Sequence, residues 1–283
     1  MQAPIKAIYN SKREEVVPGT FIERPIPQMG FKKLGPFILL DHLGPEPILP
    51  GNPINIPPHP HVGFSPVSIV LDGYLAHRDS MGNYAEINPG DVQWLTAGKG
   101  MMHEELSQKR MDEQGGTIHF VQLWVNLPKA FKKIAPTYQY IPADSIPNLD
   151  LAEGVQFRLI AGKYEGAEGP AKTYSDMVLG HLKMKEGSTV SFTLPETFDK
   201  GFFLAEGTLE VVDKTIEKEQ LVVFENGFSS FTITAKTDTD IIILTGEPIN
   251  EPLIIYGPFV VNSLQEIPEV LADYDAGKMG EVR

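Results

Sequence analysis

Residues 59–105 of the chain read HPHVGFSPVSIVLDGYLAHRDSMGNYAEINPGDVQWLTAGKGMMHEE, and this stretch decides the expected fold. Short apolar runs, for example Pro66–Leu71 and Val92–Leu95, are separated by turn sequences such as Asp72-Gly73 and Asn88-Pro89-Gly90-Asp91. Gly, Pro, Asn and Asp between short apolar runs mark tight turns between strands. Strands of four to seven residues at this spacing are typical of a β-sandwich or a barrel.

Histidines mark both ends of this stretch. His59 and His61 are two residues apart, and so are His103 and Glu105. Because alternate residues of a strand project from the same face, each pair offers two ligands side by side. Three imidazoles and a carboxylate suit a first-row divalent metal such as Fe²⁺, Mn, Ni or Cu, and Co and Zn are also compatible with these donors. The spacing therefore predicts a site for one metal ion on two neighbouring strands.

The composition agrees with β-structure and restricts the possible ligands. The 283 residues include 26 glycines and 24 prolines, a larger share than the roughly 12% of an ordinary protein. The sequence has no cysteine, which excludes disulfides, thiolate zinc sites and iron–sulfur clusters. Any metal must be bound by His, Asp or Glu.

A proline-rich connector divides the chain. Residues 135–150 contain three prolines and little apolar periodicity, which is typical of a linker between compact units. We therefore expect an N-terminal, metal-binding domain over residues 1–134 and a C-terminal domain over residues 151–283. The second of these contains only His181, so we expect no metal there.

The C-terminal part repeats the pattern of the first. Met177–Met184 and Gln220–Phe224 read as strands. The spacing Ser263-Leu264-Gln265-Glu266 is that of a capping box and predicts a helix that ends near Asp275. The sequence thus predicts an all-β protein of two tandem antiparallel sandwich or barrel domains with a short linker and a C-terminal helix.

The net charge of −13 is unevenly distributed along the sequence. Residues 1–140 hold 13 acidic and 13 basic side chains, whereas residues 141–283 hold 24 and 11. An acidic surface repels phosphates, and the N-terminal half shows no basic stripe, so direct binding of nucleic acid is not expected. The acidic C-terminal half is a candidate surface for a protein partner.

The start of the chain and its apolar runs indicate a cytoplasmic protein. Met1–Tyr9 is interrupted by Gln2, Pro4 and Lys6, unlike a signal peptide. The longest apolar runs, such as Ile241–Leu244, are too short to span a bilayer. We expect no membrane association, and a monomer whose two domains cover each other's faces.

Longer motifs in the chain resemble the pirin family of the cupin superfamily over nearly the whole length. They include His59-Pro60-His61-Val62-Gly63-Phe64, Pro89-Gly90-Asp91-Val92-Gln93-Trp94-Leu95-Thr96-Ala97-Gly98-Lys99-Gly100, His103-Glu104-Glu105, Gln122-Leu123-Trp124-Val125-Asn126-Leu127-Pro128 and Gly257-Pro258-Phe259-Val260-Val261-Asn262. The resemblance implies a bicupin with one metal, typically iron, in the N-terminal domain and a degenerate C-terminal cupin. By motif position it implies the ligands His59, His61, His103 and Glu105.

Two functions follow from the resemblance. One is a quercetin (flavonol) 2,3-dioxygenase that opens the flavonol ring with O₂, in which Glu105 would take the proton of the substrate hydroxyl; a metal-bearing half without excess charge suits an anionic aromatic substrate. The alternative is a metal-dependent, redox-sensing regulator that modulates a transcription factor or a metabolic enzyme through protein contact. Turnover of quercetin by the metal-loaded protein would distinguish the two.

Four further residues are candidates for the surroundings of the site. His42 and His77 are expected beside the ligands or at the entrance, although neither has an obvious ligand partner. Phe64 and Trp94 are expected in the core, where either could form a wall of the pocket. Many pirins carry Thr where this chain has Pro66, and proline in a strand favours edges or bulges, so the local geometry is expected to differ.

Overall fold

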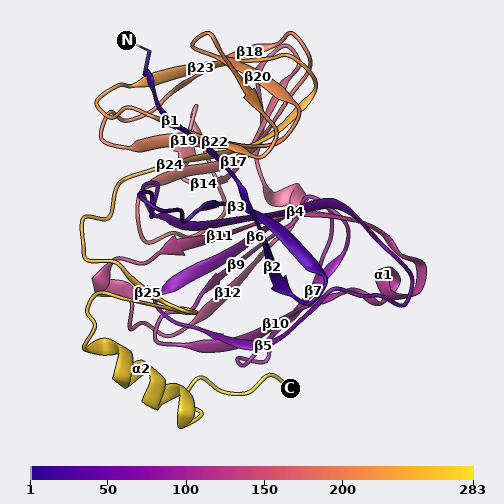
Figure 1. Cartoon of the computed structure of the whole chain (residues 1–283), viewed down its shortest axis with the longest axis vertical. Coiled ribbons are helices and arrows are strands. Elements are labelled where there is room, and N and C mark those ends of the chain that lie inside the picture. Colours follow the sequence, from indigo (N-terminus) through magenta and orange to yellow (C-terminus); the bar gives the residue numbers. More distant parts are fainter. Residues whose placement is uncertain (1) are drawn as a thin grey trace. The chain divides into compact units, whose positions relative to one another are not determined.

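The computed structural model describes residues 2–283, which form two compact units (Figure 1). The first unit comprises residues 40–143 together with 14–22 and 250–283. The second unit comprises residues 144–249 together with 23–39 and the N-terminal residues up to Arg13. Antiparallel sheets form the framework of both units, as the sequence predicts.

The first unit contains a four-stranded sheet in the order β5-β10-β7-β8 and most of a larger sheet in the order β12-β9-β6-β11-β4-β3-β2. Residues 12–13, 23–26 and 37–39 of the larger sheet belong to the second unit. The strands concerned are β2 (Lys12–Val17), β3 (Thr20–Ile26), β4 (Phe37–Ile48), β5 (Asn55–His61), β6 (Phe64–Asp72), β7 (Leu75–Asp79), β8 (Tyr84–Ile87), β9 (Val92–Thr96), β10 (Met101–Ser107), β11 (Gly116–Asn126) and β12 (Thr137–Ile141).

Pro66 lies inside β6, a central strand of the larger sheet. The strand pairs with β11 through Pro66, which lies opposite Trp124. Its pairing with β9 begins one residue later, at Val67. Pro66 therefore lies just before the first residue pair between β6 and β9.

The second unit has a seven-stranded sheet in the order β1-β22-β19-β24-β17-β14-β13 and a four-stranded sheet in the order β18-β23-β20-β21, with the pair β15-β16 apart from both. The strands are β1 (Ile5–Asn10), β13 (Asn148–Ala152), β14 (Val155–Ala161), β15 (Lys163–Tyr164), β16 (Ala167–Glu168), β17 (Met177–Met184), β18 (Thr189–Thr193), β19 (Asp199–Glu206), β20 (Thr208–Val211), β21 (Lys214–Glu217), β22 (Gln220–Phe224), β23 (Ser230–Ala235) and β24 (Thr239–Gly246). The bounds of β17 and β22 are those predicted from the sequence.

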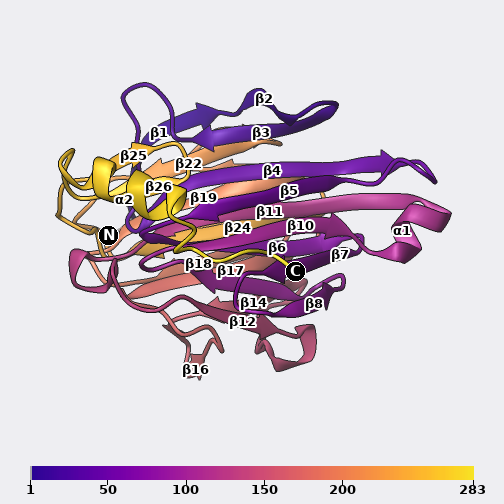
Figure 2. The same cartoon turned by 90° about the horizontal axis from the view of Figure 1, so that it is seen from below.

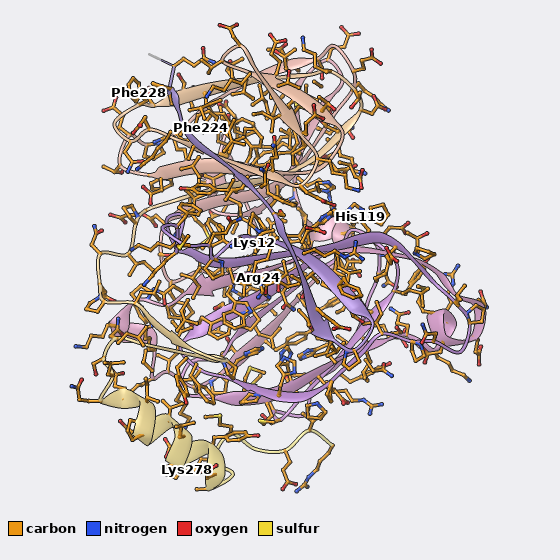
Figure 3. All side chains as sticks on the ribbon, viewed as in Figure 1. Lys12, Arg24, His119, Phe224, Phe228 and Lys278 are labelled. Atoms are coloured by element: carbon orange, nitrogen blue, oxygen red, sulfur yellow. The ribbon has the colours of Figure 1, made fainter. Side chains whose placement is uncertain are left out.

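Aromatic side chains fill the interior of the second unit. Phe192, Phe224 and Phe231 are fully buried, and the rings of Phe224 and Phe231 stack with centroids 4.4 Å apart. Phe224 is labelled among the side chains of Figure 3. Because this interior is packed with apolar groups, it offers little room for a polar site.

Each end of the chain belongs to the unit that is formed mainly by the other half of the sequence. Strand β1, near the N-terminus, pairs with β22 of the second unit. Near the other end, Val62 of the first unit forms a bridge with Phe259. The sequence boundaries at 134 and 150 miss this exchange, because a short terminal strand carries no signal of its distant partner.

The segment 135–150 is ordered structure. Strand β12 pairs with β9 from Thr137 opposite Thr96 to Ile141 opposite Val92. The Asp91 carboxylate accepts a hydrogen bond from the Tyr140 hydroxyl at 2.7 Å. The prolines of this segment therefore frame a strand rather than mark a free linker.

The helices are few and short. They are α1 (Lys109–Gln114), α2 (Glu266–Asp275) and the single 3₁₀ turns Lys129–Phe131 and Ala143–Ser145. Helix α2 follows the strand pair β25 (Ile254–Tyr256) and β26 (Phe259–Val261), beside which it lies (Figure 2). The expected capping box is wrong, because the N-cap of α2 is Gln265, two residues after Ser263, and no side chain caps it.

No helix among residues 2–283 has the length and apolar character needed to cross a membrane. The cytoplasmic location and the monomeric state stay predictions.

Candidate metal centre

Three neighbouring strands of the four-stranded sheet of the first unit place polar pairs side by side. Strand β10 lies between β5 and β7, and it places His103 opposite both His59 and Asp79. Two residues further, Glu105 lies opposite His77. Since residues two apart share a face, each strand contributes one i, i+2 pair to this face of the sheet. The pairs are His59/His61, His103/Glu105 and His77/Asp79.

Three of these histidines converge on one point. His59, His61 and His103 each offer a ring nitrogen, and the three nitrogens lie within 4.8 Å of one another. The ring centroid of His103 is 4.3 Å from that of His59 and 4.7 Å from that of His61. The two histidine motifs of the sequence, 42 residues apart at their nearest points, thus meet in space.

The protonation state of this cluster suits a metal. Burial lowers the pKa of His61 and His103 well below the usual 6.5, and the neighbouring histidines lower both further. Neutral imidazole is the form that binds a metal ion. Both ring nitrogens of His103 and Nδ1 of His61 are buried without a hydrogen-bond partner among residues 2–283. Unsatisfied buried nitrogens are costly unless they serve a ligand, so the residues present fit a first-row divalent metal.

Glu105 lies outside the group of converging histidines and has hydrogen bonds of its own. It is not one of the residues whose ligand atoms lie within 4.8 Å of one another. Its carboxylate accepts hydrogen bonds from the side chains of Ser68, Gln93 and Gln122. The fourth predicted ligand is therefore a buried carboxylate fixed beside the cluster, on the same strand as His103.

His77 lies next to the cluster, with a partner that the sequence reasoning missed. Its ring centroid is 5.5 Å from that of His103, and its Nε2 is 3.1 Å from Oδ2 of Asp79. Hydrogen bonds from His77 and Asn83 lower the pKa of Asp79, against the opposing effect of burial. The ring of Tyr138 stacks on His77 with centroids 4.5 Å apart. The i, i+2 spacing of His77 and Asp79 was the available signal.

Tyr138 brings an unpaired hydroxyl to this side of the site. The hydroxyl is buried and has no hydrogen-bond partner in the part of the chain that the structure describes. Burial raises the pKa of Tyr138, and nearby carboxylates, Asp79 foremost, raise it further. The hydroxyl is therefore neutral at physiological pH and can donate a hydrogen bond.

Aromatic rings form the opposite wall. Phe64 is fully buried, its ring centroid is 4.9 Å from that of His61, and it stacks on Trp124 at 4.1 Å. Trp94 is also buried, but its neighbour Gln93 is the residue that bonds Glu105. Because consecutive residues of a strand point to opposite faces, Trp94 faces away from the site. Trp124, which was not selected from the sequence, forms this wall of the site together with Phe64.

His42 forms a separate buried pair. Its Nε2 lies 2.9 Å from Nε2 of His119, and the ring centroids are 5.0 Å apart. Neither residue belongs to the group of converging ligand nitrogens. The structure therefore places His42 in a two-histidine contact between β4 and β11 instead of beside the metal ligands.

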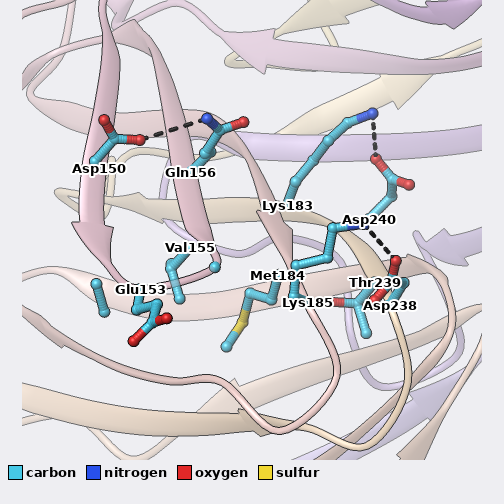
Figure 4. A pocket seen from close by; sticks show the side chains of 12 residues that line it. Asp150, Glu153, Val155, Gln156, Lys183, Met184, Lys185, Asp238, Thr239 and Asp240 are labelled. Atoms are coloured by element: carbon cyan, nitrogen blue, oxygen red, sulfur yellow. Dashed lines mark hydrogen bonds and ion pairs between the residues drawn. The ribbon is translucent and has the colours of Figure 1, made fainter.

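The second unit carries a polar groove of about 880 Å³ of a different kind (Figure 4). Lys183 pairs with Asp240 at 3.4 Å and Lys185 with Asp238 at 2.6 Å. His181 is also bound to Asp240, at 2.7 Å. These charges satisfy one another, and among residues 2–283 the only cluster with metal-ligand geometry is the histidine triad of the first unit.

Two antiparallel β units, one of them with three converging histidines on adjacent strands, define a bicupin. Two family models match the chain: Pirin over residues 19–125 and the Pirin C-terminal cupin domain over residues 179–280. The chain belongs to the pirin family.

Individual relatives agree with this assignment. The chain is 37% identical to a Pseudomonas aeruginosa protein named "Putative quercetin 2,3-dioxygenase" over 87% of this chain and 86% of that protein. It is 33% identical to a pirin-like protein of Caulobacter vibrioides over 97% and 94%. A crystal structure of quercetin 2,3-dioxygenase from Acinetobacter baumannii matches with a TM-score of 0.94 and 35% identity, covering 100% of both chains.

Proposed function

We propose that this chain is a metal-dependent dioxygenase that opens the ring of a flavonol such as quercetin with O₂. The observation that carries the proposal is the triad His59, His61 and His103, which each offer a ring nitrogen within 4.8 Å of the others. Both ring nitrogens of His103 and Nδ1 of His61 are buried without a hydrogen-bond partner among residues 2–283. The relatives named for quercetin 2,3-dioxygenase activity supply the substrate class.

The histidines would hold one divalent metal, for which we propose Fe²⁺. When bound, this ion supplies Lewis acidity and redox chemistry for the reaction of an enolate with O₂. His61 and His103 are neutral at the outset, so neither needs to lose a proton to bind the ion. Burial of the triad against Phe64 and Trp124 excludes water from that side.

Glu105 is the proposed proton acceptor. A flavonol hydroxyl placed at the cluster would give its proton to Oε2 of Glu105 when that oxygen is not bound to the metal. That carboxylate is 95% buried and oriented by three side chains, so it meets the substrate in a fixed position. Positioned general bases contribute about 10²–10⁴-fold to a rate.

The chain offers a matched pair of variants for the test. In Glu105→Gln we expect quercetin consumption and O₂ uptake by the iron-loaded protein to fall about 10²-fold or more. Glu104→Gln is the control, because Glu104 is the adjacent residue, points to the opposite face and pairs with Arg78 at 3.6 Å. Absence of turnover by the wild-type protein with every metal tested would refute the proposal, as would equal rates in the two variants.

A further inference from the structure

One carboxylate in the site receives an unusual number of hydrogen bonds. Oε1 of Glu105 accepts from Ser68 Oγ at 3.1 Å, from Gln93 Nε2 at 2.9 Å and from Gln122 Nε2 at 3.1 Å. Oε2 accepts from Gln122 Nε2 alone, at 2.9 Å. The bonding of the two oxygens is therefore unequal.

The three donors form a single row across the larger sheet of the first unit. Ser68 on β6 lies opposite Gln93 on β9 and, on its other side, opposite Gln122 on β11. Glu105 reaches this row from β10 of the other sheet. The row thus links the two walls of the unit at the level of the carboxylate.

Lone-pair counting distinguishes the two oxygens. An ionised carboxylate offers about two lone-pair positions on each oxygen. With three donors, Oε1 has no position left, whereas Oε2 with one donor retains a free position. If Glu105 joins the coordination of a metal, Oε2 is the oxygen that can do so without losing a hydrogen bond.

The orientation of the Gln93 amide is set by the carboxylate. Its Nε2 donates both to Glu105 and, at 3.0 Å, to Ser68, while its Oε1 is buried without a partner among residues 2–283. A rotated amide would place Oε1 against the carboxylate, and two acceptors repel each other. An unsatisfied buried oxygen lowers stability, so stability alone does not explain this arrangement.

We infer that Ser68, Gln93 and Gln122 are positioning residues that hold Glu105 through Oε1 and present Oε2 as the fourth metal ligand. Hydrogen-bonded partners of metal ligands fix ligand orientation, and their loss weakens metal binding about 10–100-fold. The inference rests on the metal site of the proposed function but not on its substrate.

The test is a Co²⁺ titration of the purified apo-protein, followed by visible absorption and by competition with a chelator. Gln93→Met and Gln122→Met remove the donor amides at similar volume, and we expect each to raise the Kd for Co²⁺ about 10–100-fold. Their Co²⁺ spectra should shift toward that of Glu105→Gln. Gln156→Met, at an exposed position of the second unit, is the control and should bind as the wild type does.

A purely structural role makes a different prediction. If the amides only stabilise the fold, the apo-variants would have a lower melting temperature, but their Kd for Co²⁺ would stay within twofold of the wild-type value and their Co²⁺ spectra would be unchanged. This result would overturn the inference. A wild-type Kd for Glu105→Gln would overturn it as well. Weakened Co²⁺ binding in the variants of a protein that does not oxidise quercetin would support the inference while removing the proposed substrate.

Discussion

Lys132 is a buried cation near the histidine triad. Its Nζ donates to the carbonyl oxygen of Gly63 and to Oδ1 of Asn126, both at 2.7 Å. Burial lowers the pKa of Lys132 from 10.5 to about 8, and the attraction of Glu251 and Glu266 offsets only part of this effect. The side chain ties the end of the ligand strand β5 to the end of β11, at the cost of desolvating a charge.

This pKa predicts a pH-dependent stability. Between pH 8 and 10.5 the unfolded chain holds a proton on Lys132 that the folded protein has released, so raising the pH through this window stabilises the folded state. The unfolding free energy of the wild type, minus that of Lys132→Met, should increase by on the order of 3 kcal/mol across the window.

Urea unfolding at several pH values measures this difference. Lys133→Met is the matched control, because Lys133 is exposed and pairs with Glu269 at 3.3 Å; its difference should stay nearly constant. A constant difference for Lys132→Met as well would show that the buried ammonium is not the titrating group.

At the scale of elements, the C-terminal strand closes the end of β5. Val62 N donates to the carbonyl of Pro258 at 3.3 Å, and Val260 N donates to the carbonyl of Val62 at 2.9 Å. A Cβ on Gly63, which has φ +83, would lie 1.9 Å from the carbonyl oxygen of Val260. This close approach requires glycine two residues after His61.

Gly63→Ala should therefore destabilise the protein far more than an ordinary glycine substitution. Gly82 is the control: its φ is +87, and a Cβ there meets nothing within 4 Å. We expect about 1 kcal/mol for Gly82→Ala from backbone strain and more than about 3 kcal/mol for Gly63→Ala, since overpacking is added to that strain. Denaturant unfolding of both variants measures the values. Equal losses would mean that β26 can move away from β5 without cost.

Local patterns explain which elements could be predicted. Strands such as β17 and β22 are short, mostly apolar runs bounded by turn residues, so their bounds follow from nearby sequence. The pairing of β1 with β22 and of Val62 with Phe259 joins residues about 200 apart. No local signal specifies such pairs, so the sequence does not indicate that the chain ends belong to the units that the structure gives them.

The same distinction applies to the site. The histidine triad could be predicted because i, i+2 spacing on a strand is local, and Glu105 was found with it. The row Gln93, Ser68 and Gln122 depends on the register of three strands, which the sequence does not specify. Gln93 within the apolar strand β9 is a sequence signal for a buried polar contact, but it does not indicate which carboxylate accepts its hydrogen bond.

At the scale of the whole molecule, the net charge is distributed differently between the two units than between the two halves of the sequence, because each chain end belongs to the unit of the other half. The first unit, which holds the histidine triad, has 18 acidic and 9 basic side chains; the second has 19 and 15. The count by sequence halves had placed the whole excess on the half without the triad. The unit with the triad is therefore not neutral, and the other unit is not the more acidic of the two.

The negative charge of the first unit predicts a salt effect on an anionic substrate. Screening weakens long-range repulsion, so the KM for quercetin, at a pH where the flavonol is anionic, should fall about twofold between roughly 0.02 and 0.2 M salt. Steady-state kinetics at constant pH measures it, and the same series at a pH where the flavonol is neutral is the control. A KM that rises with salt would reveal a locally positive entrance.

The most direct test of the account is the metal content of the protein by elemental analysis after loading with Fe²⁺ and removal of the excess. We expect one metal ion per chain in the wild type and in His181→Ala, whose histidine lies in the second unit, and almost none in His103→Ala. Retention of a full equivalent by His103→Ala, or failure of the wild type to retain any, would contradict it.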